Sequence, residues 1–170
     1  VKFSLPLLMG NLFQQTYNLV DTAIVGQTLG AKALAAVGSS TSIQFLVMGF
    51  CIGMSLGFSI PVGQRFGAQD YSGMHRYEYA GGILAALFAA LVTLLTTVFC
   101  NHILHLLQVP EEIFHDAWVY LIIIFCEILF TVMYNYLAGL MRAIGDSKTP
   151  FIYLAVASVL NIGLDFLFIV

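Results

Sequence analysis

The chain has 170 residues, of which 60% are hydrophobic and only 9% are charged. A soluble domain carries roughly 25% charged residues, so this composition excludes an ordinary soluble domain and indicates an integral membrane protein. The whole chain contains six Lys and Arg residues, too few for a phosphate-binding face, which excludes nucleic acid as a partner.

Five apolar stretches follow one another, each near the roughly 20 residues that a helix needs to cross a bilayer. Only helices and closed barrels satisfy their backbone in lipid, and the stretches lack the alternation of barrel strands. We therefore predict an all-α polytopic transmembrane helical bundle, with membrane lipid around it. The expected spans are about 5–27, 34–62, 79–100, 117–140 and 150–170.

The first span carries a polar stripe, in the run LFQQTYNLVDTAIVG. Gln14, Tyr17, Asn18 and Asp21 follow an i, i+3, i+4, i+7 pattern, which places them on one face of a helix. A charged side chain within lipid costs roughly several kcal/mol. The polar face of this helix must therefore contact protein or water rather than lipid. Pro6, near the start of this span, is either a helix cap or a hinge.

The middle of the chain offers three further features. Gly49, Gly53 and Gly57 predict close packing within the bundle, with a dimer interface as the alternative. Glu127 is an intramembrane acid near mid-depth, either a relay or a protonated group against a backbone carbonyl. The polar segment between the third and fourth spans contains His102, His105, Glu111, Glu112, His115 and Asp116. We expect an interfacial polar loop there rather than a metal site.

The fifth span carries a second polar stripe. It follows a turn, after which Thr149 is the expected cap and Pro150 the first helical residue. Ser158, Asn161 and Asp165 have i, i+3, i+7 spacing. These oxygens suit a hard cation or an exchangeable proton, whereas the alternative for the stripe is interhelical hydrogen bonding.

The two aspartates are expected at matching depths. Asp21 lies 16 residues past Leu5 and Asp165 lies 15 past Pro150. At 1.5 Å per residue, each is roughly 22–24 Å along its helix. If the two helices are neighbours, both carboxylates share one site.

Positive charge predicts the orientation of the chain. Only Lys32 lies between the first two spans, and the residues expected on the opposite side are Lys2, Arg65, Arg76, Arg142 and Lys148. Because cytoplasmic loops are rich in Lys and Arg, we predict a cytoplasmic N-terminus. The first residue is Val1 rather than Met, so we expect a fragment of a longer protein.

Collinear motifs along the chain resemble the multidrug and toxic compound extrusion (MATE) transporters, and look most similar to the bacterial DNA-damage-inducible-F-like branch. The motifs are LPLLMGNLFQQTYNLVDTAIVGQTLGAKALAAVG, GQRFGAQD, VPEEIFHDAWVYL, YNYLAGLMRAIGDSKTP and NIGLDFLFI. The resemblance implies a twelve-helix antiporter of two six-helix lobes. Residues 1–170 would be a partial N-terminal lobe, helices 1–5, lacking helix 6 and the C-terminal lobe.

The resemblance also implies a function. Such a protein exports drugs or other organic, often cationic, compounds from bacteria across the inner membrane, driven by Na⁺ or H⁺ and without a cofactor. In the family, a helix-1 aspartate and a helix-5 Asn-x-x-x-Asp pair hold the cation, and a helix-1 Gln, Tyr and Pro lie nearby. The matching residues are Asp21, Asn161, Asp165, Gln14, Tyr17 and Pro6. Glu127 departs from the family pattern.

Three other classes of membrane protein fit the sequence less well. Intramembrane aspartyl proteases also use two membrane aspartates, but they resemble Y-D and G-x-G-D, whereas the contexts here are V-D and G-L-D. Related lipid-linked oligosaccharide flippases typically line their cavity with several Arg, and these spans hold almost no positive charge. A non-transporting structural protein does not account for paired acids in lipid.

Overall fold

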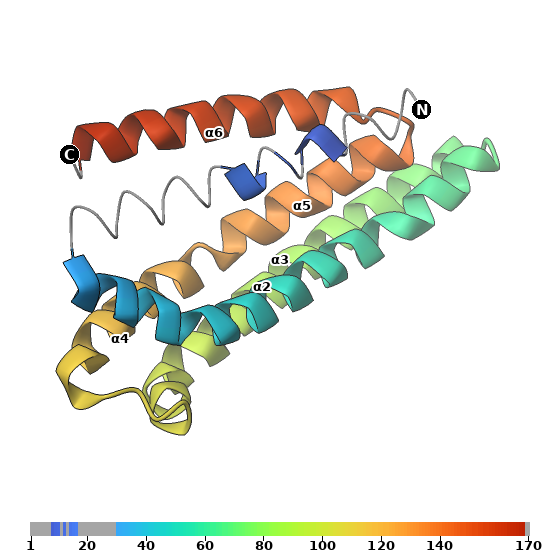
Figure 1. Ribbon diagram of the computed structural model, residues 1–170. Coiled ribbons are helices and arrows are strands. Elements are labelled where there is room, and N and C mark those ends of the chain that lie inside the picture. Colours follow the sequence, from blue (N-terminus) through green and yellow to red (C-terminus); the bar gives the residue numbers. More distant parts are fainter. Residues whose placement is uncertain (1–7, 11, 13, 17–29, 169–170) are drawn as a thin grey trace. The chain divides into compact units, whose positions relative to one another are not determined.

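The computed structural model describes residues 8–10, 12, 14–16 and 30–168, without the side chains of residues 30–34, 165, 166 and 168. The described residues form helices joined by short turns, with no strand among them, so the all-α prediction is confirmed. The principal helices are α2 (Gly30–Gly67), α3 (Tyr71–Leu106), α4 (Glu111–Cys126), α5 (Ile128–Ala143) and α6 (Lys148–Phe168) (Figure 1). Two compact units divide the chain: Val1–Ala35 with Gly145–Val170, and Ala36–Ile144.

Three described helices are long and apolar enough to cross a membrane. They are Ala35–Gly67, Tyr71–Leu106 and Glu111–Ala143, with 33, 36 and 33 residues. The last combines α4 and α5, and a shorter apolar helix covers Lys148–Leu164. The helices extend beyond the predicted spans, because polar residues at their ends remain helical outside the hydrocarbon layer. The bilayer boundaries within each helix stay predictions.

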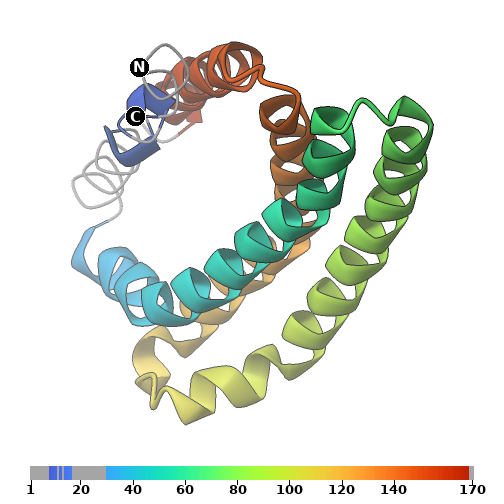
Figure 2. The same cartoon turned by 90° about the vertical axis from the view of Figure 1, so that its right-hand side faces the viewer.

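The second unit is held together where α2, α3 and α5 meet. Tyr136 on α5 is 2% exposed and donates a hydrogen bond to the backbone oxygen of Glu78 on α3, at 2.6 Å. A Cβ at Gly81 would lie 2.7 Å from the Tyr136 hydroxyl and 3.2 Å from the Phe58 oxygen. Only glycine therefore allows these helices to approach so closely. In Figures 1 and 2, α2 and α3 leave their short connecting turn side by side.

The α2 helix runs parallel to the helix formed by α4 and α5. Near one end, the Tyr120 hydroxyl donates to Gln44 Oε1 at 3.1 Å. Farther along both helices, a Cβ at Gly139 would lie 2.7 Å from Ser59 Oγ. These two contacts fix the relative direction of the helices and bring their backbones close together, as small residues do in membrane bundles.

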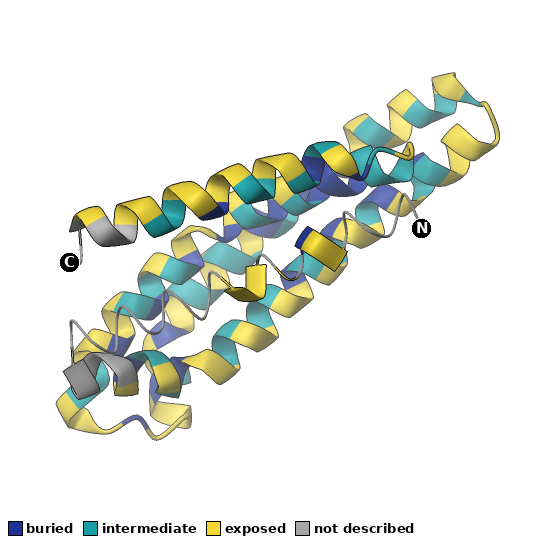
Figure 3. Cartoon of the chain, turned by 45° about the horizontal axis from the view of Figure 1, so that its top comes forward, coloured by how far each residue is buried: buried dark blue, intermediate teal, exposed yellow. Residues whose placement is uncertain are grey.

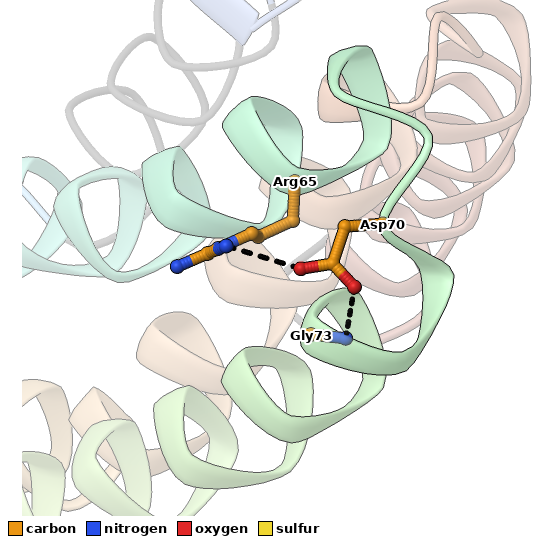
Figure 4. A network of polar contacts seen from close by, with 3 residues as sticks. All are labelled: Arg65, Asp70 and Gly73. Carbon is orange, nitrogen blue, oxygen red and sulfur yellow. Dashed lines mark hydrogen bonds and ion pairs between the residues drawn. The ribbon is translucent and has the colours of Figure 1, made fainter.

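The turn between α2 and α3 is held by one aspartate (Figure 4). Asp70 Oδ1 accepts from the backbone N–H of Gly73 at 2.9 Å, and its Oδ2 accepts from Arg65 Nη1 at 3.0 Å. Gln69 has a φ of 59°, which reverses the chain before the cap. The break here is therefore only residues 68–70, much shorter than the polar segment in the sequence.

The outer surface of the described helices is apolar. Figure 3 shows exposed residues along every described helix, among them Phe45 and Phe130, which are 82% and 75% exposed. Such a surface suits lipid. Outside the helix's own backbone, no described residue comes within 4 Å of a Cβ built at Gly49, Gly53 or Gly57, so the close packing expected of these glycines stays a prediction. These three glycines are exposed among the described residues.

Candidate cation site on α6

The start of α6 is fixed by Asp146 rather than by Thr149, which corrects the predicted cap. Asp146 Oδ1 accepts hydrogen bonds from the backbone N–H groups of Lys148 at 3.0 Å and Thr149 at 3.1 Å. Hydrogen bonds from the hydroxyl and the N–H of Thr149 hold the pKa of the Asp146 carboxyl below its ordinary 3.8. Gly145, with a φ of 93°, supplies the left-handed turn before the cap.

The predicted polar stripe lies on one continuous helix. The Ser158 hydroxyl is buried and donates to the Leu154 oxygen at 2.8 Å, so its hydrogen-bonding needs are met within α6. Asn161 differs, because its Oδ1 is buried and has no hydrogen-bond partner among the described residues. Asp165 lies one turn farther along α6, and its side chain is outside the described part of the chain.

The N-terminal residues lie against the same helix. A Cβ at Gly10 would be 3.4 Å from Leu154 Cδ2 and 3.8 Å from Phe151 Cδ2. Both segments belong to the first compact unit, and the described pieces at 8–10 and 14–16 run in the same direction as α6 (Figure 1). The described beginning of the first predicted span is thus a neighbour of α6, a relation that the sequence left open.

The spacing of polar residues after this contact is the same in both segments. The residues at i+4, i+7 and i+11 from Leu154 are Ser158, Asn161 and Asp165. The residues at the same intervals from Gly10 are Gln14, Tyr17 and Asp21. In a helix these intervals keep to one face. The spacing therefore predicts that the two aspartates lie on the faces that contain Gly10 and Leu154.

The structure describes only part of the predicted site. Gln14 lies in a short helical piece and is exposed. The predicted residues that fall outside the described residues are Pro6, Tyr17, Asn18 and Asp21. What the structure adds is the face of α6 with its unbonded amide oxygen, and the close approach at Gly10.

Glu127 lies in the other unit, at the point where α4 ends and α5 begins. Its side chain is exposed, and its backbone keeps helical hydrogen bonds, donating to Ile123 at 3.2 Å and accepting from Thr131 at 3.0 Å. Sequence reasoning placed this acid near mid-depth but missed the interruption. It also missed Thr131 and Asn135, although their i+4 and i+8 spacing from Glu127 was a usable signal.

The prediction of a polar loop across residues 102–116 is wrong, because His102 and His105 lie in α3 and His115 lies in α4. His105 lies against Phe114 with ring centroids 4.8 Å apart, and His115 stacks on Trp118 at 6.5 Å. Within the described part of the chain, no group of three His, Cys, Asp or Glu residues could hold a metal ion. A hollow of about 580 Å³ is lined by Thr97, Val98, Asn101, Phe114, His115 and Trp118.

Residues 6–167 match the MatE family, so the chain belongs to the MATE transporters. It is 37% identical over 176 residues to the probable multidrug resistance protein YpnP of Bacillus subtilis (strain 168), covering 99% of this chain and 38% of that protein. It is 35% identical over 162 residues to the probable multidrug resistance protein YoeA of the same organism, covering 95% of this chain and 35% of that protein.

A solved structure shares the fold. A MOP superfamily transporter from Pyrococcus furiosus Vc1 (DSM3638) superposes with a TM-score of 0.92 at 27% identity, covering 99% of this chain and 37% of that one. The chain thus spans less than two fifths of the length of these relatives.

Family membership confirms the resemblance, and the long apolar helices agree with a multi-pass membrane protein. Because the family consists of transporters, the intramembrane protease alternative is excluded. The assignment to the DNA-damage-inducible-F-like branch stays a prediction.

Proposed function

We propose that the full-length protein is a secondary antiporter that exports drugs or other organic compounds by alternating access, driven by an H⁺ or Na⁺ gradient. The observation that carries this proposal is the buried Oδ1 of Asn161, which has no hydrogen-bond partner among the described residues and lies one turn before Asp165 on α6. Buried polar atoms in proteins nearly always have a partner, and an exception is often explained by an ion or a water. The multidrug resistance names of the relatives support the substrate class.

Asp21, Asn161 and Asp165 are the proposed cation or proton site. Carboxylate and amide oxygens are ligands that a hard cation accepts. Two carboxylates on facing helices repel each other when both are charged, and a bound cation or proton removes that repulsion. The site therefore has one state with the ion and another without it, as an antiporter requires.

The remaining predicted residues connect this site to transport. Gln14, Tyr17, Asn18 and Ser158 line the cavity, and Pro6 is the point at which the first helix bends when the ion leaves. Substrate binding competes with the ion, because an organic cation near the same acids neutralises the same charge. Coupling requires that the ion binds more tightly to one of the two conformations of alternating access than to the other.

The proposed setting follows from charge and from the lengths of the relatives. We infer a bacterial inner membrane and a cytoplasmic N-terminus, since the Lys and Arg residues concentrate on the side of Lys2. A sixth helix and a C-terminal lobe of the same protein are the proposed partners, together with lipid and a small-molecule substrate. These partners would complete the cavity.

The test is dye efflux from vesicles that contain the full-length protein, with Na⁺ and H⁺ gradients imposed separately. Asp21→Asn and Asp165→Asn should each abolish efflux driven by the coupling ion. Asp116→Asn, the same change at an exposed residue near the start of α4, should leave efflux unchanged. Ion-driven efflux that persists in both site variants at the wild-type rate would show that the mechanism is wrong.

A further inference from the structure

Glu127 is a carboxylate at the centre of a long apolar helix. It separates the 16 residues of α4 from the 16 residues of α5. The combined helix, Glu111–Ala143, is apolar enough to cross a membrane. The side chain is nevertheless exposed, and no hydrogen bond or ion pair joins it to another described residue. An acid at this depth is a candidate functional group unless something else accounts for it.

Glu127 belongs to a polar flank of the helix, which we define as Glu127, Thr131 and Asn135. Their i, i+4, i+8 spacing places them in one row. The amide of Asn135 donates to the Thr131 backbone oxygen at 2.8 Å, which keeps this side chain against the helix. A polar row along a membrane helix must meet water, protein or cargo rather than lipid.

The other sides of the helix are apolar and have separate roles. The side packed into the unit carries the fully buried residues Ile128, Val132 and Tyr136. A third side is exposed and apolar, with Leu129 and Leu137 at 40% and 50% exposure. Because lipid already has an apolar side to cover, the polar flank is free to face a hydrated cavity.

The positive residues of the unit, Arg65, Arg76 and Arg142, lie toward helix ends, whereas Glu127 is at the middle of its combined helix. The sequence has no Lys or Arg between Arg76 and Arg142, nor between Lys32 and Arg65. Arg142 is 15 residues farther along the same helix, which is roughly 22 Å at 1.5 Å per residue. A positive charge beside Glu127 is therefore expected to come from outside the unit.

The surroundings of Glu127 favour an organic cation over a small ion. A small hard cation takes about six oxygen ligands, and the polar flank offers one carboxylate. The exposed side chains nearest in the helix are instead large and apolar, with Ile123 62% and Phe130 75% exposed. A single charge beside aliphatic and aromatic surface is the usual arrangement of a site for a hydrophobic cation.

We propose that the Glu127 carboxylate recognises the cationic group of an exported organic cation, with the polar flank as the wall of that subsite. The proposal rests on the proposed export function and assigns Glu127 a role separate from the coupling residues Asp21 and Asp165.

The test is equilibrium binding of ethidium, a permanently cationic aromatic dye, to the purified full-length protein. Glu127→Gln should weaken ethidium binding at least tenfold, whereas Glu127→Asp should keep most of it. Glu112→Gln, an exposed glutamate in the first turn of α4, is the matched control and should bind as wild type. Equal affinity in wild type and Glu127→Gln, or no binding by wild type, overturns the proposal.

A second measurement covers the case in which Glu127→Gln does not fold. Carbodiimide labels carboxyl groups in membranes, and the label at Glu127 in the wild-type protein is quantified by mass spectrometry of its peptide. Ethidium should reduce labelling at Glu127 several-fold, and unchanged labelling overturns the proposal. If ethidium binds through Glu127 but neither gradient drives its efflux, the export function is wrong while the recognition site stands.

Discussion

Two polar side chains inside apolar helices, Tyr136 and Asn161, differ in their hydrogen bonding. The Tyr136 hydroxyl in the second unit donates to Glu78 at 2.6 Å and sits where Gly81 lets three helices converge. The Oδ1 atom of Asn161 in the first unit is also buried and has no partner among the described residues. One polar group joins two helices, and the other has no hydrogen-bond partner among the described residues.

The difference gives a criterion for separating packing from function in a membrane helix. A polar group kept for packing finds an acceptor, as the buried hydroxyl of Ser55 does on Cys51 at 2.6 Å. A buried donor or acceptor without a hydrogen bond costs about 1–3 kcal/mol of stability, so a buried amide oxygen that lacks a partner needs an explanation. Two hydroxyls on α3, Thr93 and Thr97, are also unbonded, but no carboxylate lies within a turn of either.

The largest expected effect comes from Asn161→Leu in the full-length protein. Ion-driven efflux should fall at least tenfold, because an oxygen ligand is lost. The thermal stability of the ion-free protein should hold or rise, since an unbonded buried amide is removed. Efflux assays and thermal unfolding by size-exclusion chromatography provide the two readouts. Unchanged efflux together with reduced stability would show that Asn161, like Tyr136, serves packing rather than ion binding.

Gly81→Ala should affect stability rather than transport. The new Cβ would lie 2.7 Å from the Tyr136 hydroxyl and 3.2 Å from the Phe58 oxygen. Overpacking of this kind costs about 1–3 kcal/mol in the free energy of unfolding. Gly53→Ala is the control, because no described residue lies within 4 Å of its Cβ position. Gly53→Ala should stabilise the helix slightly, and equal destabilisation by both changes would contradict the packing described here.

Tyr136→Phe should have a smaller effect on the same contact. Loss of the hydrogen bond to Glu78 is expected to cost about 0.6 kcal/mol, the average found for such bonds within membranes. In this background, Gly81→Ala should cost less than in wild type, because the nearest atom is gone. Thermal unfolding of the two single variants and the double variant measures this coupling, and strict additivity would argue against it.

The smallest effect concerns the Asp146 cap. Hydrogen bonds from Thr149 lower the pKa of the Asp146 carboxyl in the folded protein. The charged carboxyl therefore stabilises α6 fully above the unfolded pKa near 3.8. This stabilisation is lost as the pH falls through the lower folded pKa. Hydrogen exchange at Lys148 and Thr149 should be faster in Asp146→Ala than in wild type at pH 5. The difference should disappear at a pH below the folded pKa. A difference that persists there would mean that another group caps the helix.

The sequence predicted the helical class and the face shared by Ser158, Asn161 and Asp165, because hydropathy and 3.6-residue periodicity are local properties. It did not predict how far the helices extend, since polar residues near 70 and 105 are compatible with either helix or loop. The contact between Gly10 and Leu154 and the open space at Gly53 depend on packing between distant segments. The Asp146 cap was missed because three polar residues compete for that role within four positions.

The central claim is that the polar face of α6 binds the coupling ion. Its most direct test is ion binding to purified full-length protein, comparing wild type with Asp165→Asn in Na⁺ titrations of thermal stability and in measurements of proton uptake. A bound ion stabilises the folded state by about 2.7 kcal/mol at one hundred times its dissociation constant. The account predicts that one of the two ions binds to wild type and not to Asp165→Asn. Identical ion binding by both proteins would contradict it.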